Sequence, residues 1–260
     1  MMKKMTTWYT NQLVPWLFPI IAIVLWQVLG QSGIISSSIL PTPLDVIDAA
    51  IQLTSSGKLQ EHVYISTQRA LIGFFIGGII GFILGLLNGT VKFFEKTTDT
   101  TMQMIRTIPH LALIPLVILW FGIGESAKIF LVALGVMFPV YINTFSGIQN
   151  VDRKLIEMGT VYGLSKWKLF TNIILPGALS SILVGIRYAL GVMWMSLIVA
   201  ETIGADSGIG FMATSAREFM QMDIVVLTIV LYAILGKLSD VIAKLFERRF
   251  LKWNPVYRKK

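Results

Sequence analysis

The sequence predicts an all-α, polytopic membrane protein with six transmembrane helices. Hydrophobic residues make up 55% of the 260 residues and only 14% are charged, whereas soluble domains carry about 25% charged residues. The charged residues cluster between long apolar runs. Because an apolar run of about 20 residues forms a helix that crosses about 30 Å of hydrocarbon, composition and pattern together favour a set of spanning helices.

Six apolar runs are long enough, or nearly long enough, to span the membrane. They cover residues 13–30, 69–89, 111–124, 127–145, 177–203 and 224–246. The third run is short, and only the turn at 122–126 separates it from the fourth, so these two are expected to form an antiparallel helical hairpin. The first run is too long for a signal peptide and no cleavage site follows it, which favours a retained span.

A short amphipathic helix is expected between the first two spans, at the outer membrane surface. Thr42 followed by Pro43 is a typical helix start, because threonine caps free N–H groups and proline has none to leave unbonded. Apolar residues then recur at helical spacing until Gly57; they are Leu44, Ile47 and Ile51.

The lysine and arginine residues predict how the spans are oriented. With the N-terminus inside, the inner segments hold 17 of these residues and the outer segments hold four; the inner segments are 1–12, 90–110, 146–176 and 237–260. Cytoplasmic loops carry such an excess, so both termini are expected on the cytoplasmic side of the inner membrane. The net charge of +8 therefore indicates membrane orientation rather than nucleic-acid binding.

Three parts of the chain are expected to differ in role. Residues 1–60 would form the first span and the outer helix, and residues 61–246 a core that contains the cytoplasmic loop 146–176. Residues 247–260 form a basic tail with aromatic residues. Such a tail is typical of an anchor at the lipid interface, and a partner site is the alternative.

Five glycines in the second run recur every four residues: Gly73, Gly77, Gly81, Gly85 and Gly89. This spacing places them on one helix face, where another backbone can approach closely. The face is expected either to pack within the subunit or to slide during a conformational change.

The loop 146–176 carries a polar and basic insert that cannot lie in hydrocarbon. It is expected to form two short helices joined at Gly163, with apolar contacts from Met158 on the first and Trp167 on the second. Pro176 would begin the fifth span, where a missing N–H leaves nothing unbonded. Surface features of this kind on a membrane protein are expected to bind partners.

The spacing in this insert resembles the cytoplasmic EAA loop of ABC-importer permeases. The family pattern E-A-A-x3-G-x9-I-x-L-P is matched in register by Glu157, Gly163, Ile173, Leu175 and Pro176, and it departs at two positions, Met158 and Gly159, where the family has alanine. Segments 108–122, 126–135, 175–179 and 198–203 are similar to the sulfonate, taurine and nitrate branch. Segments 216–219, 231–237 and 253–255 are similar to aliphatic-sulfonate permeases in particular.

The resemblance implies a type I ABC-importer permease fold and a set of partners. Two copies of a separate ATPase would bind ATP and Mg²⁺. They would contact the loop at Glu157, at Gly163 and along the short helix that follows Gly163. A second copy of the chain and an extracytoplasmic substrate-binding protein would complete the importer. Aliphatic sulfonates are the expected substrates, with taurine, nitrate or another small anion as alternatives, because selectivity in this class resides largely in the binding protein.

Two charged residues of the fifth run are candidates for the translocation pathway. Arg187 lies 11 residues beyond Pro176, which is about 16 Å along a helix and near the bilayer midplane. A buried arginine must face protein or water, so it would either line the path of an anion or bond helix carbonyls or Glu201. Glu201 would meet a substrate-delivery protein or balance local charge.

Other classes of function are poorly supported by the sequence. The chain has no cysteine and only two histidines, His62 and His110, which fall on opposite sides in this topology, so no metal site is expected. It has no P-loop motif and cannot bind ATP in that manner. A membrane enzyme would need paired carboxylates or similar groups, and a secondary transporter would need ion sites and inverted repeats; neither pattern is present.

Overall fold

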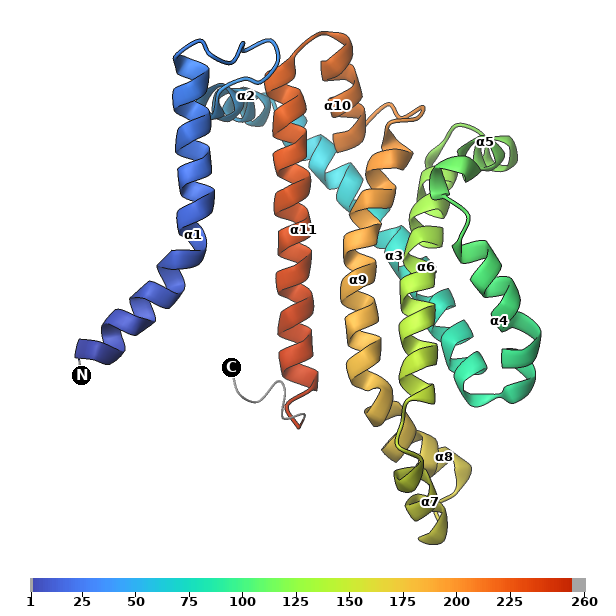
Figure 1. Cartoon of the computed structure of the whole chain (residues 1–260). Coiled ribbons are helices and arrows are strands. Elements are labelled where there is room, and N and C mark those ends of the chain that lie inside the picture. Colours follow the sequence, from blue (N-terminus) through green and yellow to red (C-terminus); the bar gives the residue numbers. More distant parts are fainter. Residues whose placement is uncertain (1, 254–260) are drawn as a thin grey trace. The chain divides into compact units, whose positions relative to one another are not determined.

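The computed structural model describes residues 2–253, and the side chains of residue 14 and of 17–253 other than 110 and 111. This part of the chain consists of helices joined by turns and loops and has no strand, which confirms the predicted all-α class. Its helices (Figure 1) are α1 (Met2–Gln31), α2 (Pro43–Ser55), α3 (Lys58–Thr90), α4 (Lys92–Arg106), α5 (His110–Phe121), α6 (Glu125–Gln149), α7 (Arg153–Val161), α8 (Lys166–Leu169), α9 (Leu175–Glu201), α10 (Ile209–Glu218) and α11 (Met222–Phe250).

Four helical stretches are long and apolar enough to cross a membrane: Lys58–Thr90, Glu125–Gln149, Lys166–Glu201 and Met222–Phe250. Two apolar stretches are shorter, Leu17–Gln31 and Ala112–Phe121. The 12 residues of α5 extend only about 18 Å, because Pro109 and Gly122 stop the helix at its two ends. The total of six spans stays a prediction.

The chain forms two compact units, and the first comprises Met1–His62 and Met212–Leu231. Its best-defined element is α2, which begins as the sequence predicts: Thr42 and Asp45 cap each other reciprocally and Pro43 is the first helical residue. Val46 and Ala49 face a small apolar core with Leu227. The predicted stripe of Leu44, Ile47 and Ile51 faces outward and is exposed, as a helix at a membrane surface requires.

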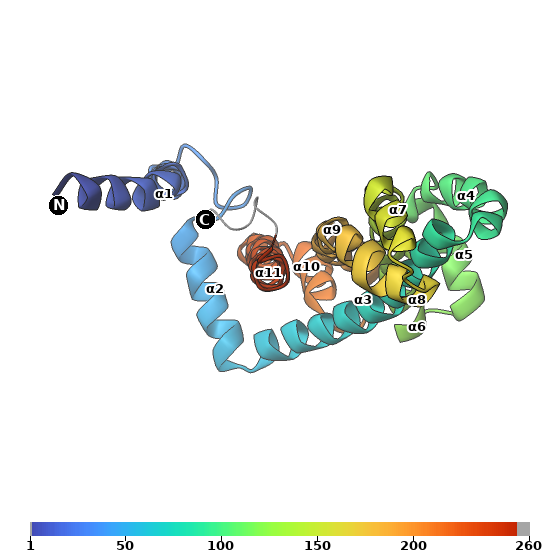
Figure 2. The ribbon, with the colours of Figure 1, turned by 90° about the horizontal axis from the view of Figure 1, so that it is seen from below.

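The second unit comprises Val63–Phe211 and Tyr232–Lys260. Its centre is the pair α6 and α9, which lie side by side (Figure 1) and share a buried core around Val136, Val140, Met193 and Leu197. Figure 2 looks along these helices from the end that carries α7 and α8. Gly122 adopts a positive φ of 73° in the expected turn between α5 and α6, and Val117 of α5 packs against Ala127 and Leu131 of α6. The two helices do not form the expected antiparallel hairpin, because α5 is seen nearly end-on in Figure 1 whereas α6 is seen from the side.

The glycine stripe of α3 faces α6. A methyl group added at Gly77 or Gly81 would meet the backbone carbonyl of Ala133 or Met137, respectively. A methyl group at Gly85 would lie 2.7 Å from the backbone carbonyl oxygen of Tyr141. The helices therefore approach so closely that only glycine fits at these positions. Gly73 and Gly89 continue the contact against side chains of α6, so within this subunit the stripe is a packing surface.

Three elements differ from the sequence prediction. Segment 90–110, expected to be an inner loop, contains the amphipathic helix α4, which is tied down because Thr98 bonds Asn88 and Tyr141 bonds Asp99. The helix α3 begins 11 residues before the predicted second span. The closely spaced glycines 204, 208 and 210 indicate turns in the sequence, but Gly210 lies in α10, where its backbone N–H donates to Glu201.

Replacing Gly81 by leucine is expected to disrupt the packing of α3 on α6. The added side chain meets backbone, which cannot move aside, and overpacking of this kind costs about 1–3 kcal/mol or more. Thermal unfolding in detergent should show a clearly lower midpoint for Gly81→Leu. The matched control is Gly78→Leu on the same helix, where an added Cβ has only one neighbour, 4.0 Å away; equal midpoints for the two variants would contradict this account.

Candidate functional site

The predicted loop forms two short helices joined at a glycine. Asp152 caps α7 by accepting the Lys154 N–H, and Ser165 caps α8 by accepting the Lys168 N–H. Between them Gly163 has a φ of +74°, a left-handed conformation that residues with a side chain rarely adopt. The sequence prediction of a glycine joint therefore agrees with the backbone.

One face of the loop packs onto the start of the long helix. Gly159 is buried, and a methyl group at this position would lie 2.6 Å from the Ile173 side chain. Ile156 joins Ile173 against a core formed by Val151 and Ala178. The departure from alanine at Gly159 is explained by this contact, because here α7 lies directly on the turn that precedes α9.

The opposite face of the loop is exposed and apolar. Trp167 is 72% exposed, Tyr162 80% and Val161 86%, and Leu155 and Met158 are also exposed. Glu157 lies among them, exposed on α7. A groove of about 450 Å³ runs beside Trp167 and Phe170 toward Leu86 and Thr90 at the end of α3. This combination of exposed aromatic side chains and a groove suits a protein partner.

Pro176 lies in the first turn of α9, as the sequence predicts, but α9 follows the preceding helical residues without a break. The whole helix is continuous from Lys166 to Glu201, with one π-helical turn over Phe170–Ile174 in which the Leu175 N–H bonds the Phe170 carbonyl. A proline within an α-helix loses one hydrogen bond and clashes with a carbonyl of the preceding turn. The wider π turn relieves that clash, so the loop and the long helix are one element.

The far end of this helix is held by a buried cluster of charges. Glu201 is 1% exposed and Arg69 is 4% exposed, and the Arg69 Nη1 lies 2.8 Å from Glu201. Arg69 Nη2 also lies 2.6 Å from Glu125 at the start of α6. Glu201 further accepts bonds from Ser66, the Gly210 N–H and Tyr232. One guanidinium thus joins three helices, α3, α6 and α9.

This geometry corrects the expectations for Glu201 and Arg187. The two residues are 14 positions apart on one helix, or about 21 Å, and cannot pair; Arg187 bonds Glu247 at 3.0 Å instead. Glu201 has no exposed surface for a delivery protein, which favours its role in balancing local charge. Arg69 begins the second apolar run, and nothing in the local sequence indicates its partners Glu125 and Glu201, which come 56 and 132 positions later.

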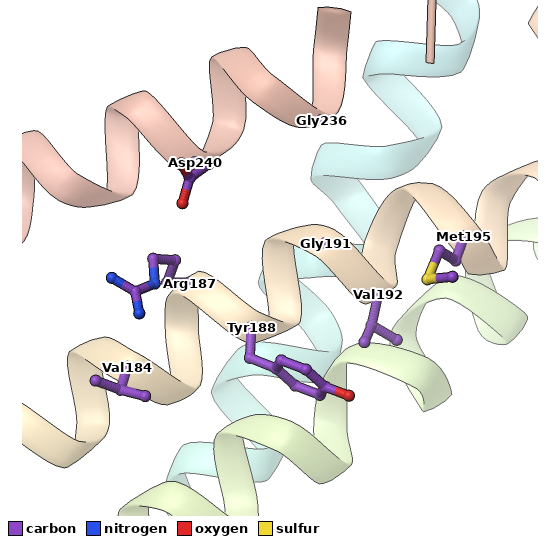
Figure 3. Close-up of a pocket in the computed structure, with 8 residues that line it drawn as sticks. All are labelled: Val184, Arg187, Tyr188, Gly191, Val192, Met195, Gly236 and Asp240. Carbon is purple, nitrogen blue, oxygen red and sulfur yellow. The ribbon is translucent and has the colours of Figure 1, made fainter. Parts of the chain in front are cut away.

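Arg187 lies at a hollow between α9 and the second half of α11. The hollow has a volume of about 370 Å³, and Figure 3 shows Arg187 and Asp240 extending toward each other from the two helices. Its other lining residues are Val184, Tyr188, Gly191, Val192, Met195 and Gly236. Arg187 is 35% exposed, so its guanidinium is open to the hollow.

The depth of Arg187 in the bilayer, predicted near the midplane by counting from Pro176, stays a prediction. The partner of Arg187, Glu247, is three residues from the end of α11, and Lys237, Asp240 and Lys244 lie in the second half of the same helix. The sequence does not indicate that Glu247 pairs with Arg187, because Glu247 directly follows the sixth apolar run and belongs to the predicted basic tail.

These features describe a helical protein with an exposed apolar loop face and a hollow beside Arg187. Among the described residues there is no group of three or more metal-binding side chains. The sequence profile of the binding-protein-dependent transport system inner membrane components matches residues 77–252. The chain therefore belongs to this family and is a multi-pass inner membrane protein.

Relatives within the family include transport permeases for sulfur compounds. The chain is 58% identical to the aliphatic sulfonates transport permease protein SsuC of Escherichia coli K12, over 96% of this chain and 95% of the relative. It is 46% identical to SsuC of Bacillus subtilis 168, over 93% and 87%. It is 31% identical to the taurine transport system permease protein TauC of Escherichia coli K12, over 90% and 87%.

A solved structure shares the fold. The crystal structure of an amino acid ABC transporter with histidines matches 79% of this chain and 97% of that chain, with a TM-score of 0.64 and 19% identity. The likeness confirms the predicted type I ABC-importer permease fold.

Replacing Arg69 by methionine is expected to destabilise the chain by about 3–5 kcal/mol, because it leaves Glu201 buried and uncompensated. Thermal unfolding in detergent should show a large fall in the midpoint. The control is Lys237→Ala, which removes an exposed ion pair with Asp240 at 4.0 Å and should cost less than about 1 kcal/mol. Similar midpoints for the two variants would show that the buried cluster does not hold the helices.

Proposed function

We propose that this chain is the permease subunit of an ATP-driven importer that carries small organic anions, in particular aliphatic sulfonates, across the inner membrane. The observation that carries the proposal is the continuity between the exposed loop and the long helix Lys166–Glu201. A partner that moves the loop must move this helix with it. The apolar face around Trp167 and Tyr162 supplies a contact surface for that partner.

Two copies of an ATPase would bind this face from the cytoplasm and would supply ATP and Mg²⁺. Two copies of the permease chain would form the pathway, and a binding protein would deliver substrate from outside. The charge asymmetry of the sequence supports this orientation, with both termini and the loop 146–176 in the cytoplasm. The basic tail 247–260 would contact the lipid interface, although residues 254–260 lie outside the described residues.

ATP binding would draw the two ATPase subunits together and, with them, the two loops. The contact between Gly159 and Ile173 transmits this motion from α7 to the helix. The helix would then tilt as a rigid rod, and the pathway would change from inward-facing to outward-facing. The α3 glycine stripe would keep α3 packed on α6 during this motion, because the two backbones approach closely along it.

Arg187 would contact the anion in the pathway. A sulfonate is a permanent monoanion at physiological pH, and a guanidinium binds such oxygen groups through paired N–H donors. The names of the two SsuC relatives support a sulfonate substrate over taurine or nitrate. A secondary transporter or a membrane enzyme stays a weaker alternative, since neither explains the exposed loop.

The partner contact is tested by co-purification. Trp167→Ala should reduce capture of the ATPase about 30-fold, since loss of a central aromatic contact costs about 2 kcal/mol or more; Glu157→Lys and Gly163→Pro should have the same effect. Trp253→Ala removes another tryptophan, 61% exposed, outside the loop and is the matched control. Equal capture by all these variants would contradict the proposed coupling role.

The substrate is tested in vesicles that contain the permease, its ATPase and its binding protein. Uptake of ethanesulfonate should require ATP, and excess unlabelled alkanesulfonate should compete with it more strongly than taurine or nitrate does. Uptake by the permease alone, without nucleotide, would contradict the proposal. Stronger competition by taurine or nitrate would assign the transporter to another branch of the family.

A further inference from the structure

The two clusters of charge in the second unit differ in one respect that bears on ligand binding. In the cluster at Arg69, two cations (Arg69 and Lys128) face two carboxylates (Glu125 and Glu201), and both cations are buried. This cluster is electrically neutral. Each nitrogen of the Arg69 guanidinium donates to Glu125, Glu201 or Ser207, so Arg69 has no nitrogen left to bind an anion.

The cluster at Arg187 is not neutral. Arg187, Lys237 and Lys244 supply three positive charges, while Asp240 and Glu247 supply two negative charges. Each cation has a carboxylate partner, but Lys237 and Lys244 share Asp240, so these five groups together carry a net charge of +1. The Asp240 carboxylate is held at 2.7 Å by Lys244, and of the five Arg187 donors only one, on Nη1, is given to Glu247.

Apart from Arg187, Asp240 and the Tyr188 hydroxyl, the lining of the hollow is apolar. Val192 and Met195 follow Arg187 along α9, and Gly191 and Gly236 face the hollow from α9 and α11 (Figure 3). A methyl group added at either glycine would have no atom within 4 Å. The two glycines therefore leave space that no side chain of this chain fills, and a volume of about 370 Å³ is in the range of small-molecule sites.

We propose that this hollow is a subsite for an amphiphilic monoanion, which binds with its sulfonate group at Arg187 and its alkyl chain along Gly191, Val192 and Met195. The inference rests on the proposed function and deepens it, because it assigns chain-length selectivity to the permease itself. The Arg187 donors that Glu247 leaves open match the oxygens of a sulfonate, and the apolar wall matches an alkyl chain.

The same geometry disfavours an amino group on the chain. An ammonium would lie against Val192 and Met195, which offer no acceptor, and burying an unpaired charge is costly. Nitrate would use Arg187 but would leave the apolar wall empty.

The test uses the assembled complex in vesicles and a series of sulfonates from methane- to hexanesulfonate. Gly191→Leu fills the hollow without meeting protein atoms, so uptake of the longer sulfonates should fall at least tenfold while methanesulfonate uptake changes less than twofold. Arg187→Gln should lower the uptake of every member at least tenfold, and Arg187→Lys should restore part of it. Gly78→Leu, which enters a different space on α3, is the matched control and should leave the profile unchanged.

Each variant is first checked for ATPase capture, so that a failure to assemble is not mistaken for a loss of the subsite. If the wild-type complex imports no sulfonate, the proposed function is wrong. If the wild type imports sulfonates but Gly191→Leu and Arg187→Gln keep its chain-length profile, the subsite is wrong. An Arg187→Gln effect that appears only in vesicles with anionic lipid would assign the hollow to a lipid headgroup and would also overturn the proposal.

Discussion

The rest of the structure depends on one constraint, the unbroken helix from Lys166 to Glu201. Its 36 residues extend about 54 Å, whereas the hydrocarbon core is about 30 Å thick, so part of the helix must lie outside the hydrocarbon. The loop packs on one end through Gly159 and Ile173, and Arg69 holds the other end through Glu201. A displacement of the loop would therefore move the near end of this helix while Arg69 holds the far end, so the helix would tilt.

The charges along this rod follow from the same arrangement. At its far end the carboxylate of Glu201 accepts bonds from Arg69, Ser66, Gly210 and Tyr232, and such a satisfied network holds a fixed geometry. Midway along the rod Arg187 keeps most of its donors open beside an apolar hollow. The first cluster suits a structural joint, and the second suits a ligand that comes and goes.

Much of this architecture could be predicted from local sequence signals. The Thr42–Pro43 start of α2, the Gly122 turn and the Gly163 joint each depend on a residue whose backbone preference is decided locally. The sequence does not predict that the helix continues through Pro176, because a proline usually indicates a helix start. The π-helical turn before Pro176 accommodates the proline, and this turn depends on how the loop packs. The Arg69 cluster and the Arg187–Glu247 pair join residues 132 and 60 positions apart, so only the tertiary structure identifies the partners. Helix α4 was missed because its charges were interpreted as marks of membrane orientation alone.

The central claim is that the loop and the long helix move as one rigid element. The chain has no cysteine, so spin labels can be placed at Lys168 and Thr202 alone, in one permease copy of the complex with its ATPase. These positions lie at the two ends of the helix, about 51 Å apart at 1.5 Å per residue. The account predicts that the distance between the labels is the same without nucleotide and with ATP trapped by vanadate, while labels at Tyr162 of the two copies approach each other. A change in the Lys168–Thr202 distance that accompanies loop closure would show that the helix bends at the π turn, and it would contradict the rigid connection.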